Sequence, residues 1–263
     1  NGSSHASGIK NEEELKNKFN KERPLAEHFL PELRDGTKYE AKKAGGTKQK
    51  ADLEVVMATD TKRFSLKKKE GTRVGSYDWV NTGRPITADP RFADLCALCK
   101  SFQRGKPPTK AEYAAAKKMV TAALVENRRL FTGEDILDIL ATHVVEPYEI
   151  IDLILINDVV NRKLYGCAPN ALPFFKYMGG SHREVFVREN GKKSASVIFK
   201  DASGNELDFG IRFRLETNNG ITAMFGGRPG KNNSSSPVIK IQQDNVKGLL
   251  DSIDGDDLTV WSY

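Results

Sequence analysis

Five short segments in the last third of the chain alternate apolar and polar residues. They are residues 184–188, 195–200, 207–216, 221–225 and 238–242. Asn190-Gly191, Ser203-Gly204-Asn205 and Asn218-Asn219-Gly220 lie between them and are typical of tight turns. A period of two lets a strand bury one face, which a helix cannot do with the same pattern. We therefore predict an antiparallel β meander of about five strands here, with a Gly-, Asn- and Ser-rich loop over residues 226–237.

The earlier part of the chain mixes helical and strand patterns. Apolar residues form a rough helical stripe over residues 9–29, which Pro24 interrupts, and further helices are predicted at 89–103, 110–131 and 133–143. Strands are predicted at 39–43, 51–58 and 63–69, the last two forming a hairpin across residues 59–62. The apolar run 150–160 fits either a buried strand or a helix.

Together these elements predict a mixed α/β (α+β) fold in consecutive regions. Residues 1–8 are typical of an expression remnant and are set aside. Residues 9–86 hold the first helix and the hairpin, and residues 87–180 form a helical middle segment. For the β-rich residues 181–263 we expect a substrate-binding or dimerisation role.

Composition narrows the classes of protein to consider. No run approaches the ~20 apolar residues of a membrane span, and no signal peptide is visible, so we expect no membrane partner. The three cysteines fit a reducing compartment, and we expect a cytoplasmic protein of a bacterial or phage-infected cell. Cys96 and Cys99 form a C-x-x-C in an apolar stretch, which favours two buried thiols over a zinc site.

The charge balance favours an anionic partner. The chain has 41 Lys and Arg against 35 Asp and Glu, a net charge of +6. Basic residues concentrate between positions 38 and 73: Lys38, Lys42, Lys43, Lys48, Lys50, Lys62, Arg63, Lys67, Lys68, Lys69 and Arg73. Such a run indicates nucleic acid, although a solvated face, or an edge hairpin whose lysines prevent aggregation, explains it as well.

Within this run the hairpin places chemically useful side chains together. Residues two apart share one face of a strand, so Ser65 and Lys67 point one way while Phe64 and Leu66 point towards a core. With a turn centred near Asp60, Asp52 would lie near Lys67 and Lys68 on the facing strand. An acid, a second oxygen ligand and a lysine are the minimum for metal-assisted phosphodiester hydrolysis.

Ala51-Asp52 followed by Ser65-Leu66-Lys67 resembles the PD-(D/E)XK, or restriction-endonuclease-like, nuclease superfamily. Its signature is an acid at the start of one strand and acid-x-Lys on the next, often with an acid on the preceding helix. The resemblance covers residues 9 to about 81 and implies that residues 9–86 are the N-terminal half of a nuclease core. It also implies Mg²⁺-dependent hydrolysis of DNA, with Mn²⁺ as a substitute, and by analogy a homodimer.

The resemblance implies roles for individual residues. Asp52 would bind the metal, Ser65 would complete the shell where the family usually has an acid, and Lys67 would orient the attacking water. The helix acid is chosen from several, and Glu14 is preferred because Leu15 beside it lies on the buried stripe. The alternatives are Glu12, Glu13, Glu22, Glu27 and, on the strand at 39–43, Glu40.

Further residues are candidates for contact with the nucleic acid. Lys68, Lys69, Arg73 and Arg84 suit phosphates, and Gln242 and Gln243 suit base edges. Two rival classes remain: a non-catalytic basic protein that binds nucleic acid, and a structural protein that binds a partner through the C-terminal sheet. Neither DNA over RNA nor a recognition sequence follows from the residues.

Overall fold

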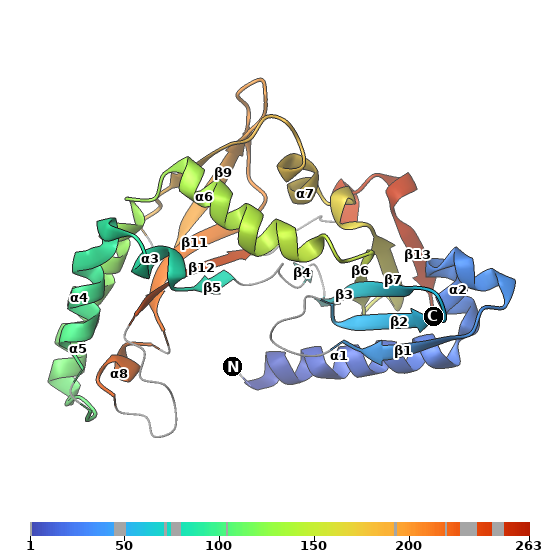
Figure 1. The fold of residues 1–263 in the computed structure, drawn as a ribbon, viewed down its shortest axis with the longest axis horizontal. Helices are drawn as coiled ribbons and strands as arrows, with labels where there is room; N and C mark the ends of the chain where they lie inside the picture. Colours follow the sequence, from blue (N-terminus) through green and yellow to red (C-terminus); the bar gives the residue numbers. More distant parts are fainter. Residues whose placement is uncertain are drawn as a thin grey trace. The chain divides into compact units, whose positions relative to one another are not determined.

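A computed structural model describes residues 2–44, 51–70, 73–74, 80–103, 105–191, 194–218, 220–226, 236–243 and 250–263. The chain divides into two units, each assembled from separate stretches. The first unit comprises Asn1–Ser76, Leu140–Ser181 and Asn245–Tyr263; the second comprises Tyr77–Ile139 and His182–Asp244. Both contain helices and a β-sheet, so the predicted α+β class is confirmed at that level (Figure 1). The units therefore interleave along the chain, whereas the sequence suggested three consecutive regions.

A seven-stranded sheet forms the centre of the first unit. Its order is β1-β2-β3-β6-β7-β13, with β4 beside β3, and only the β3–β6 pair among these described strands is parallel. The strands are β1 (Tyr39–Lys43), β2 (Leu53–Met57), β3 (Thr61–Glu70), β4 (Arg73–Val74), β6 (Leu153–Asp158), β7 (Lys163–Cys167) and β13 (Thr259–Ser262). The run 150–160 thus forms a buried strand at the middle of the sheet, while β7 and β13 were not predicted.

Two helices cover one face of this sheet (Figure 1). They are α1 (Gly2–Lys21) and α2 (Arg23–Phe29), which meet at Glu22 because Pro24 is accepted only in the first turn of a helix. Their buried Leu15, Phe19 and Phe29 pack on Phe64 and on other inward-facing strand residues. The break expected at Pro24 is confirmed, and α1 continues through residues 2–8, which the sequence analysis set aside.

The second chain stretch of the first unit begins at Leu140, where a helix of the second unit ends. After α6 (Gly133–Leu140), the chain makes a π-turn at Ala141–Val145 and a 3-10 turn, η4, at Glu146–Tyr148. A short helix, α7 (Pro173–Met178), follows β7 and packs Phe175 against Tyr148, with ring centroids 4.9 Å apart. The predicted helix 133–143 therefore changes its hydrogen-bonding pattern at Ala141.

The second unit holds the predicted meander and a bundle of helices. Its antiparallel sheet has the order β10-β9-β11-β12-β5, with β8 also beside β9. The strands are β5 (Val80–Thr82), β8 (Glu184–Arg188), β9 (Ala195–Lys200), β10 (Glu206–Leu207), β11 (Ile211–Thr217) and β12 (Pro237–Gln243). The helices are α3 (Arg84–Thr87), α4 (Ala93–Ser101), α5 (Lys110–Arg128), α8 (Ile221–Met224) and α6 up to its last residue.

One predicted strand of the meander is wrong. Residues 221–225 form the short helix α8 and its end, following Gly220 with a φ of +81°. Met224 and Phe225 are both buried although they are adjacent, which a strand with one covered face does not allow. Phe225 packs on Phe102, with ring centroids 5.5 Å apart. Tertiary packing therefore decides this segment. No helix in the described ranges is long and apolar enough to cross a membrane.

Candidate active site

Asp52 lies where the chain enters β2, and its neighbours on β3 hold its carboxylate through one oxygen. The Oδ2 atom accepts a hydrogen bond from the Leu66 backbone N–H at 2.7 Å and one from the Ser65 hydroxyl at 3.2 Å. The Asp52 backbone N–H donates to the Phe64 carbonyl at 2.9 Å. The other carboxylate oxygen, Oδ1, accepts no hydrogen bond from any residue within the described ranges. The sheet thus holds the Asp52 carboxylate through Oδ2 and leaves Oδ1 without a hydrogen bond from the described residues.

The register of the hairpin differs from the prediction. Leu53 pairs with Phe64, and the hydrogen bond from Met57 N–H to the Asp60 carbonyl (2.8 Å) closes a two-residue turn at Ala58 and Thr59. The turn was expected near Asp60, with Asp52 opposite Lys67 and Lys68, and that placement is wrong. Because the turn comes earlier, Asp52 lies beside Ser65 instead. The grouping of Asp52 with Ser65 on one face is nevertheless as predicted.

Ser65 is buried rather than open to solvent. Its side chain is 1% exposed, and its Oγ lies 3.5 Å from the hydroxyl of Tyr148 in η4. The apolar side of the hairpin matches expectation, since Phe64 and Leu66 belong to the core beneath α1 and α2. The polar side, however, is covered at Ser65 by a residue 83 positions away. The role that the structure gives Ser65 is therefore to donate a hydrogen bond to the Asp52 carboxylate.

Electrostatics link Asp52 to Lys67 and to an acid of α1. Burial raises the pKa of Asp52 above its ordinary value, and the charge of Glu12 raises it further. The positive charge of Lys67 and the Leu66 N–H bond act in the opposite direction, but the net shift is upward. Two carboxylates and one ammonium therefore influence each other at the start of β2.

The structure associates Glu12, not the preferred Glu14, with Asp52. Glu14 is exposed and lies 3.8 Å from Lys10, one turn earlier on α1. Glu12 lies 2.9 Å from Lys43 of β1. With about 100° per residue, Glu12 is about 60° from the centre of the buried stripe of Asn11, Leu15 and Phe19, against about 100° for Glu14. Measuring these angles would have favoured Glu12 from the sequence.

The candidate phosphate contacts on β3 point to opposite faces of the sheet. Lys69 shares the face of Ser65 and Lys67, where its ammonium lies 2.5 Å from the buried carboxylate of Asp158. Lys68 lies on the α1 face and is aligned with Asn157, which donates to Asn11 of α1. The two lysines therefore cannot contact one phosphate strand together. Arg73 belongs to β4, and its side chain lies outside the described residues.

Three further candidates belong to the second unit. Arg84 is exposed at the start of α3. Gln243 is buried, and its Nε2 donates to the Phe209 carbonyl at 2.9 Å, so it supports a loop rather than presenting its amide. Its neighbour Gln242 is half-buried and pairs with Arg212 across the sheet. Tyr77 and Trp79, whose rings are of a type that can stack on a base, lie outside the described residues, as does the pair Gly45-Gly46 that follows β1 in the sequence.

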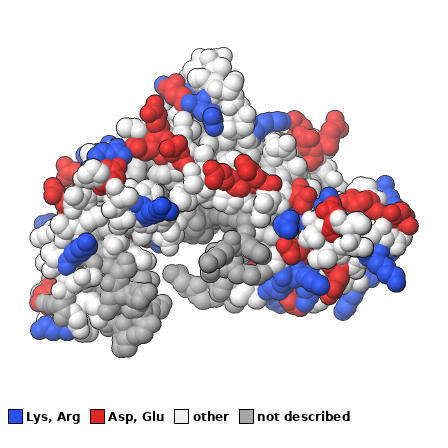
Figure 2. Space-filling view, viewed as in Figure 1, with Lys and Arg blue, Asp and Glu red and all other residues white. Residues whose placement is uncertain are grey.

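Most basic residues of the run 38–73 that the structure describes have acidic neighbours. The pairs are Lys42–Glu40, Lys43–Glu12, Lys62–Asp60, Arg63–Glu54 and Lys69–Asp158. Figure 2 shows the result, with acidic and basic side chains interspersed over α1 and strands β1 to β3. The run therefore does not form a uniformly positive surface over these residues.

The cysteines do not present thiolates. Cys96 and Cys99 lie one turn apart on α4, where Cys99 is buried, and Cys167 is buried in β7. Burial raises the pKa of Cys99 and of Cys167 to about 12, which keeps both as neutral thiols at pH 7. The expectation of two buried thiols is therefore confirmed for Cys99, whereas Cys96 is half-buried.

Comparison with known proteins adds no family assignment. No model of a known protein family matches the chain, and no curated protein sequence matches it significantly. Across the described residues, no group of three or more His, Cys, Asp or Glu side chains is placed to hold a metal ion. The candidate site therefore depends on its own geometry: two carboxylates, a buried hydroxyl and a lysine.

Proposed function

We propose that the chain is a metal-dependent nuclease that hydrolyses DNA phosphodiester bonds, with its active site at Asp52. The observation that carries the proposal is the half-buried Asp52 carboxylate, held through Oδ2 by Ser65 and Leu66 and influenced by Lys67 and Glu12. The hairpin with an acid on the preceding helix supports the resemblance to PD-(D/E)XK nucleases. In this proposal Glu12 replaces Glu14 as the helix acid.

The donor set suits a hard divalent cation such as Mg²⁺ or Mn²⁺. Mg²⁺ takes one or two carboxylates from a protein and keeps several waters, so a third acid is not required. Asp52 Oδ1 is without a hydrogen bond from the described residues, and two neighbouring carboxylates repel each other unless a cation offsets them. Asp52 and Glu12 would hold the ion, which would offset phosphate charge and favour ionisation of a bound water.

The remaining residues act through position and charge. Lys67 follows Ser65 on the same face and would orient the attacking water and offset charge at the phosphate. Ser65 and the Leu66 N–H keep Asp52 in one orientation, because both bind the same oxygen. Ser65 is thus a positioning residue, which explains why a hydroxyl is accepted where the family pattern usually has an acid.

Plasmid cleavage tests the proposal. Supercoiled plasmid is incubated with Mg²⁺ or Mn²⁺ and with wild type, Asp52→Ala or Lys67→Ala protein. Asp60→Ala and Lys62→Ala are matched controls, since both residues belong to the same hairpin at its turn end. We expect metal-dependent cleavage by wild type and both controls, and loss of cleavage in both test variants.

Two other results would contradict the proposal in different ways. Cleavage that persists in Asp52→Ala and Lys67→Ala would place the active site elsewhere. DNA binding without any cleavage by wild type would assign the chain to the class of non-catalytic nucleic-acid-binding proteins.

A further inference from the structure

Helix α5 of the second unit packs on the sheet with one side and exposes a long face to solvent. Thr109 and Glu112 form a capping box at its start, which satisfies N–H groups that the helix itself leaves unpaired. The buried stripe of Ala116, Val120 and Leu124 faces the sheet. Packing along about two and a half turns holds the helix in one position, so side chains on its outer side have a rigid base.

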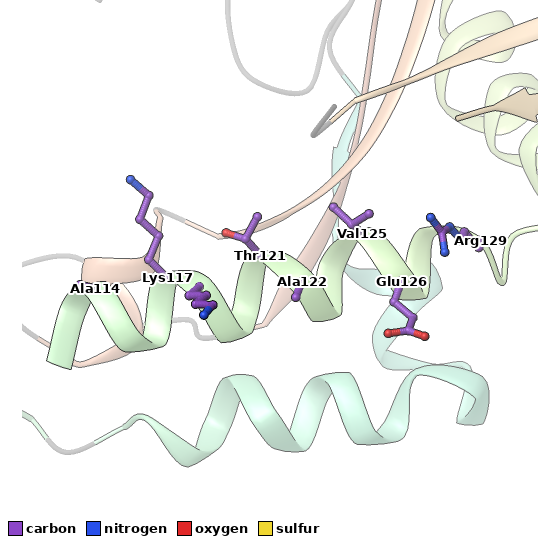
Figure 3. Close-up of a pocket in the computed structure, with 8 residues that line it drawn as sticks. Ala114, Lys117, Thr121, Ala122, Val125, Glu126 and Arg129 are labelled. Atoms are coloured by element: carbon purple, nitrogen blue, oxygen red, sulfur yellow. The ribbon is translucent and has the colours of Figure 1, made fainter. Parts of the chain in front are cut away.

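The outer side of α5 carries a shallow groove of about 700 Å³ (Figure 3). We call it the α5 groove, and its lining residues are Ala114, Lys117, Lys118, Thr121, Ala122, Val125, Glu126 and Arg129. Small side chains occupy the middle, and basic side chains occupy both ends. Lys118 and Arg129 are eleven residues apart, about 16 Å along a helix axis. The groove is therefore low in relief and positively charged towards its ends.

The cations of the α5 groove are not neutralised as those of the hairpin are. Neither Lys118 nor Arg129 forms an ion pair with any other residue in the described ranges, and both are exposed. Lys117 lies over the Tyr113 ring, 5.9 Å from its centroid, and is also exposed. Among the described residues, Glu126 is the one acid that lines the groove. Three cations against one acid leave a net positive surface.

A second cleft continues the surface towards the sheet. It holds about 320 Å³ and shares Lys117, Thr121 and Val125 with the α5 groove. Arg214 and Glu216 of β11, which form an ion pair at 2.8 Å, line its other side. This cleft adds one cation and one acid that pair with each other, so the unpaired positive charge stays with the cations of the α5 groove.

We propose that the α5 groove binds the phosphate backbone of nucleic acid, a role that rests on nucleic acid being the substrate of the proposed nuclease. Phosphates follow one another every 3.4 Å along each strand axis, so a 16 Å span between cations covers about five of them. The Thr121 hydroxyl between the cations is a further donor to phosphate, and Ala114 and Ala122 allow close approach. Such contacts hold a strand without reading its sequence.

Binding of duplex DNA by the full chain tests this role. A labelled duplex is titrated with protein in EDTA, so that no cleavage occurs, and fluorescence anisotropy gives the dissociation constant. The test variant is Lys118→Glu/Arg129→Glu. The control is Lys21→Glu/Arg34→Glu, which makes the same charge change at exposed residues of the first unit outside the basic run 38–73. We expect about 10- to 100-fold weaker binding for the test variant and less than about 3-fold for the control.

Several outcomes would overturn the proposal. If both double variants bind DNA equally weakly, the effect comes from net charge alone. If the test variant binds DNA as tightly as wild type, the α5 groove is not a DNA-binding surface. Poly-glutamate tests the rival ligand: if the test variant loses affinity for it but keeps its affinity for DNA, the groove binds an acidic protein instead. Circular dichroism checks that each variant is folded, and Lys118→Ala/Arg129→Ala repeats the test without added acids. The binding assay omits divalent metal, so its result does not depend on cleavage. Failure of wild type to cleave plasmid would therefore refute the proposed nuclease activity without changing the measured DNA affinities.

Discussion

Basic residues are prominent both in the hairpin region of the first unit and on α5 of the second, yet the two regions use them differently. In the hairpin, Lys43, Lys62 and Lys69 each lie beside a carboxylate. On α5, Lys118 has Ala114 four residues before it and Ala122 four residues after it, so no helical neighbour can neutralise it. Strand pairing and packing bring distant acids to the hairpin, whereas the alanines of α5 keep acids away. The density of basic residues in a sequence therefore does not give the position of positive surface.

The largest expected difference between the regions is chemical. Lys67→Ala should lower the rate of DNA cleavage about 100- to 1,000-fold, because it removes a charge positioned at the reacting phosphate. Lys118→Ala on α5 should lower the affinity for DNA and leave the rate at saturating DNA unchanged. Single-turnover cleavage over a range of protein concentrations separates rate from affinity. If Lys67→Ala and Lys118→Ala lower the cleavage rate at saturating DNA equally, the hairpin and α5 do not differ in catalytic role.

The next prediction concerns how firmly the hairpin cations are paired. Lys69→Met leaves the Asp158 carboxylate buried without its ammonium partner, and this should lower the free energy of unfolding by about 3 kcal/mol. Asn161 still donates to Asp158, which limits the loss. Lys62→Met removes the partner of the solvent-exposed Asp60 and should lower the free energy of unfolding far less. Urea denaturation followed by circular dichroism measures both, and equal effects would contradict the assignment of Asp158 as a buried partner.

Asp52 and Asp60 should respond to pH with opposite signs. Burial raises the pKa of Asp52, so its ionised form destabilises the fold above that pKa. Asp52→Asn should therefore stabilise the metal-free protein at pH 8, and the gain should disappear as the pH falls towards 4. The hydrogen bond from Lys62 lowers the pKa of Asp60, so Asp60→Asn should slightly destabilise the protein at pH 8. Thermal unfolding in EDTA at both pH values provides the measurement.

The smallest effect is the salt dependence of binding by α5. Removing two phosphate contacts should reduce the slope of log affinity against log salt by about 1.8. Lys118→Ala/Arg129→Ala should show this change in anisotropy titrations between 50 and 200 mM NaCl, values chosen to span the usual range. Lys21→Ala/Arg34→Ala should leave the slope as in wild type. A slope that falls equally in both would mean that the duplex does not distinguish the α5 groove from other basic surface.

Local patterns predicted much of the fold. The strands at 39–43, 184–188 and 195–200 lie where alternation placed them, and Phe64 and Leu66 face the core as their spacing required. Long-range features escaped prediction. β7 and β13 pair although they lie far apart in the sequence, so no local pattern predicts the pair. The segment 221–225 is helical because of its tertiary packing, although its residues alternate as in a strand. The interleaving of the two units is likewise set by contacts that no local pattern contains.

The candidate site was predicted in part for the same reason. Asp52 and Ser65 are neighbours because a hairpin is local, although the turn at Ala58 and Thr59 shifted their register. The cover that Tyr148 provides for Ser65 was not predictable, because it comes from a different part of the chain. Glu12 was predictable from helical geometry, which places it nearer than Glu14 to the buried stripe.

Binding of Mn²⁺ measured by isothermal titration calorimetry tests the central claim most directly. The account predicts binding by wild type and by Asp60→Asn, no measurable binding by Asp52→Asn, weakened binding by Glu12→Gln and unchanged binding by Glu14→Gln. Asn keeps the size of Asp52 and can still accept from Ser65 and Leu66, so a loss reports on the charge and not on the fold. Binding of Mn²⁺ to Asp52→Asn with the affinity of wild type would contradict the account.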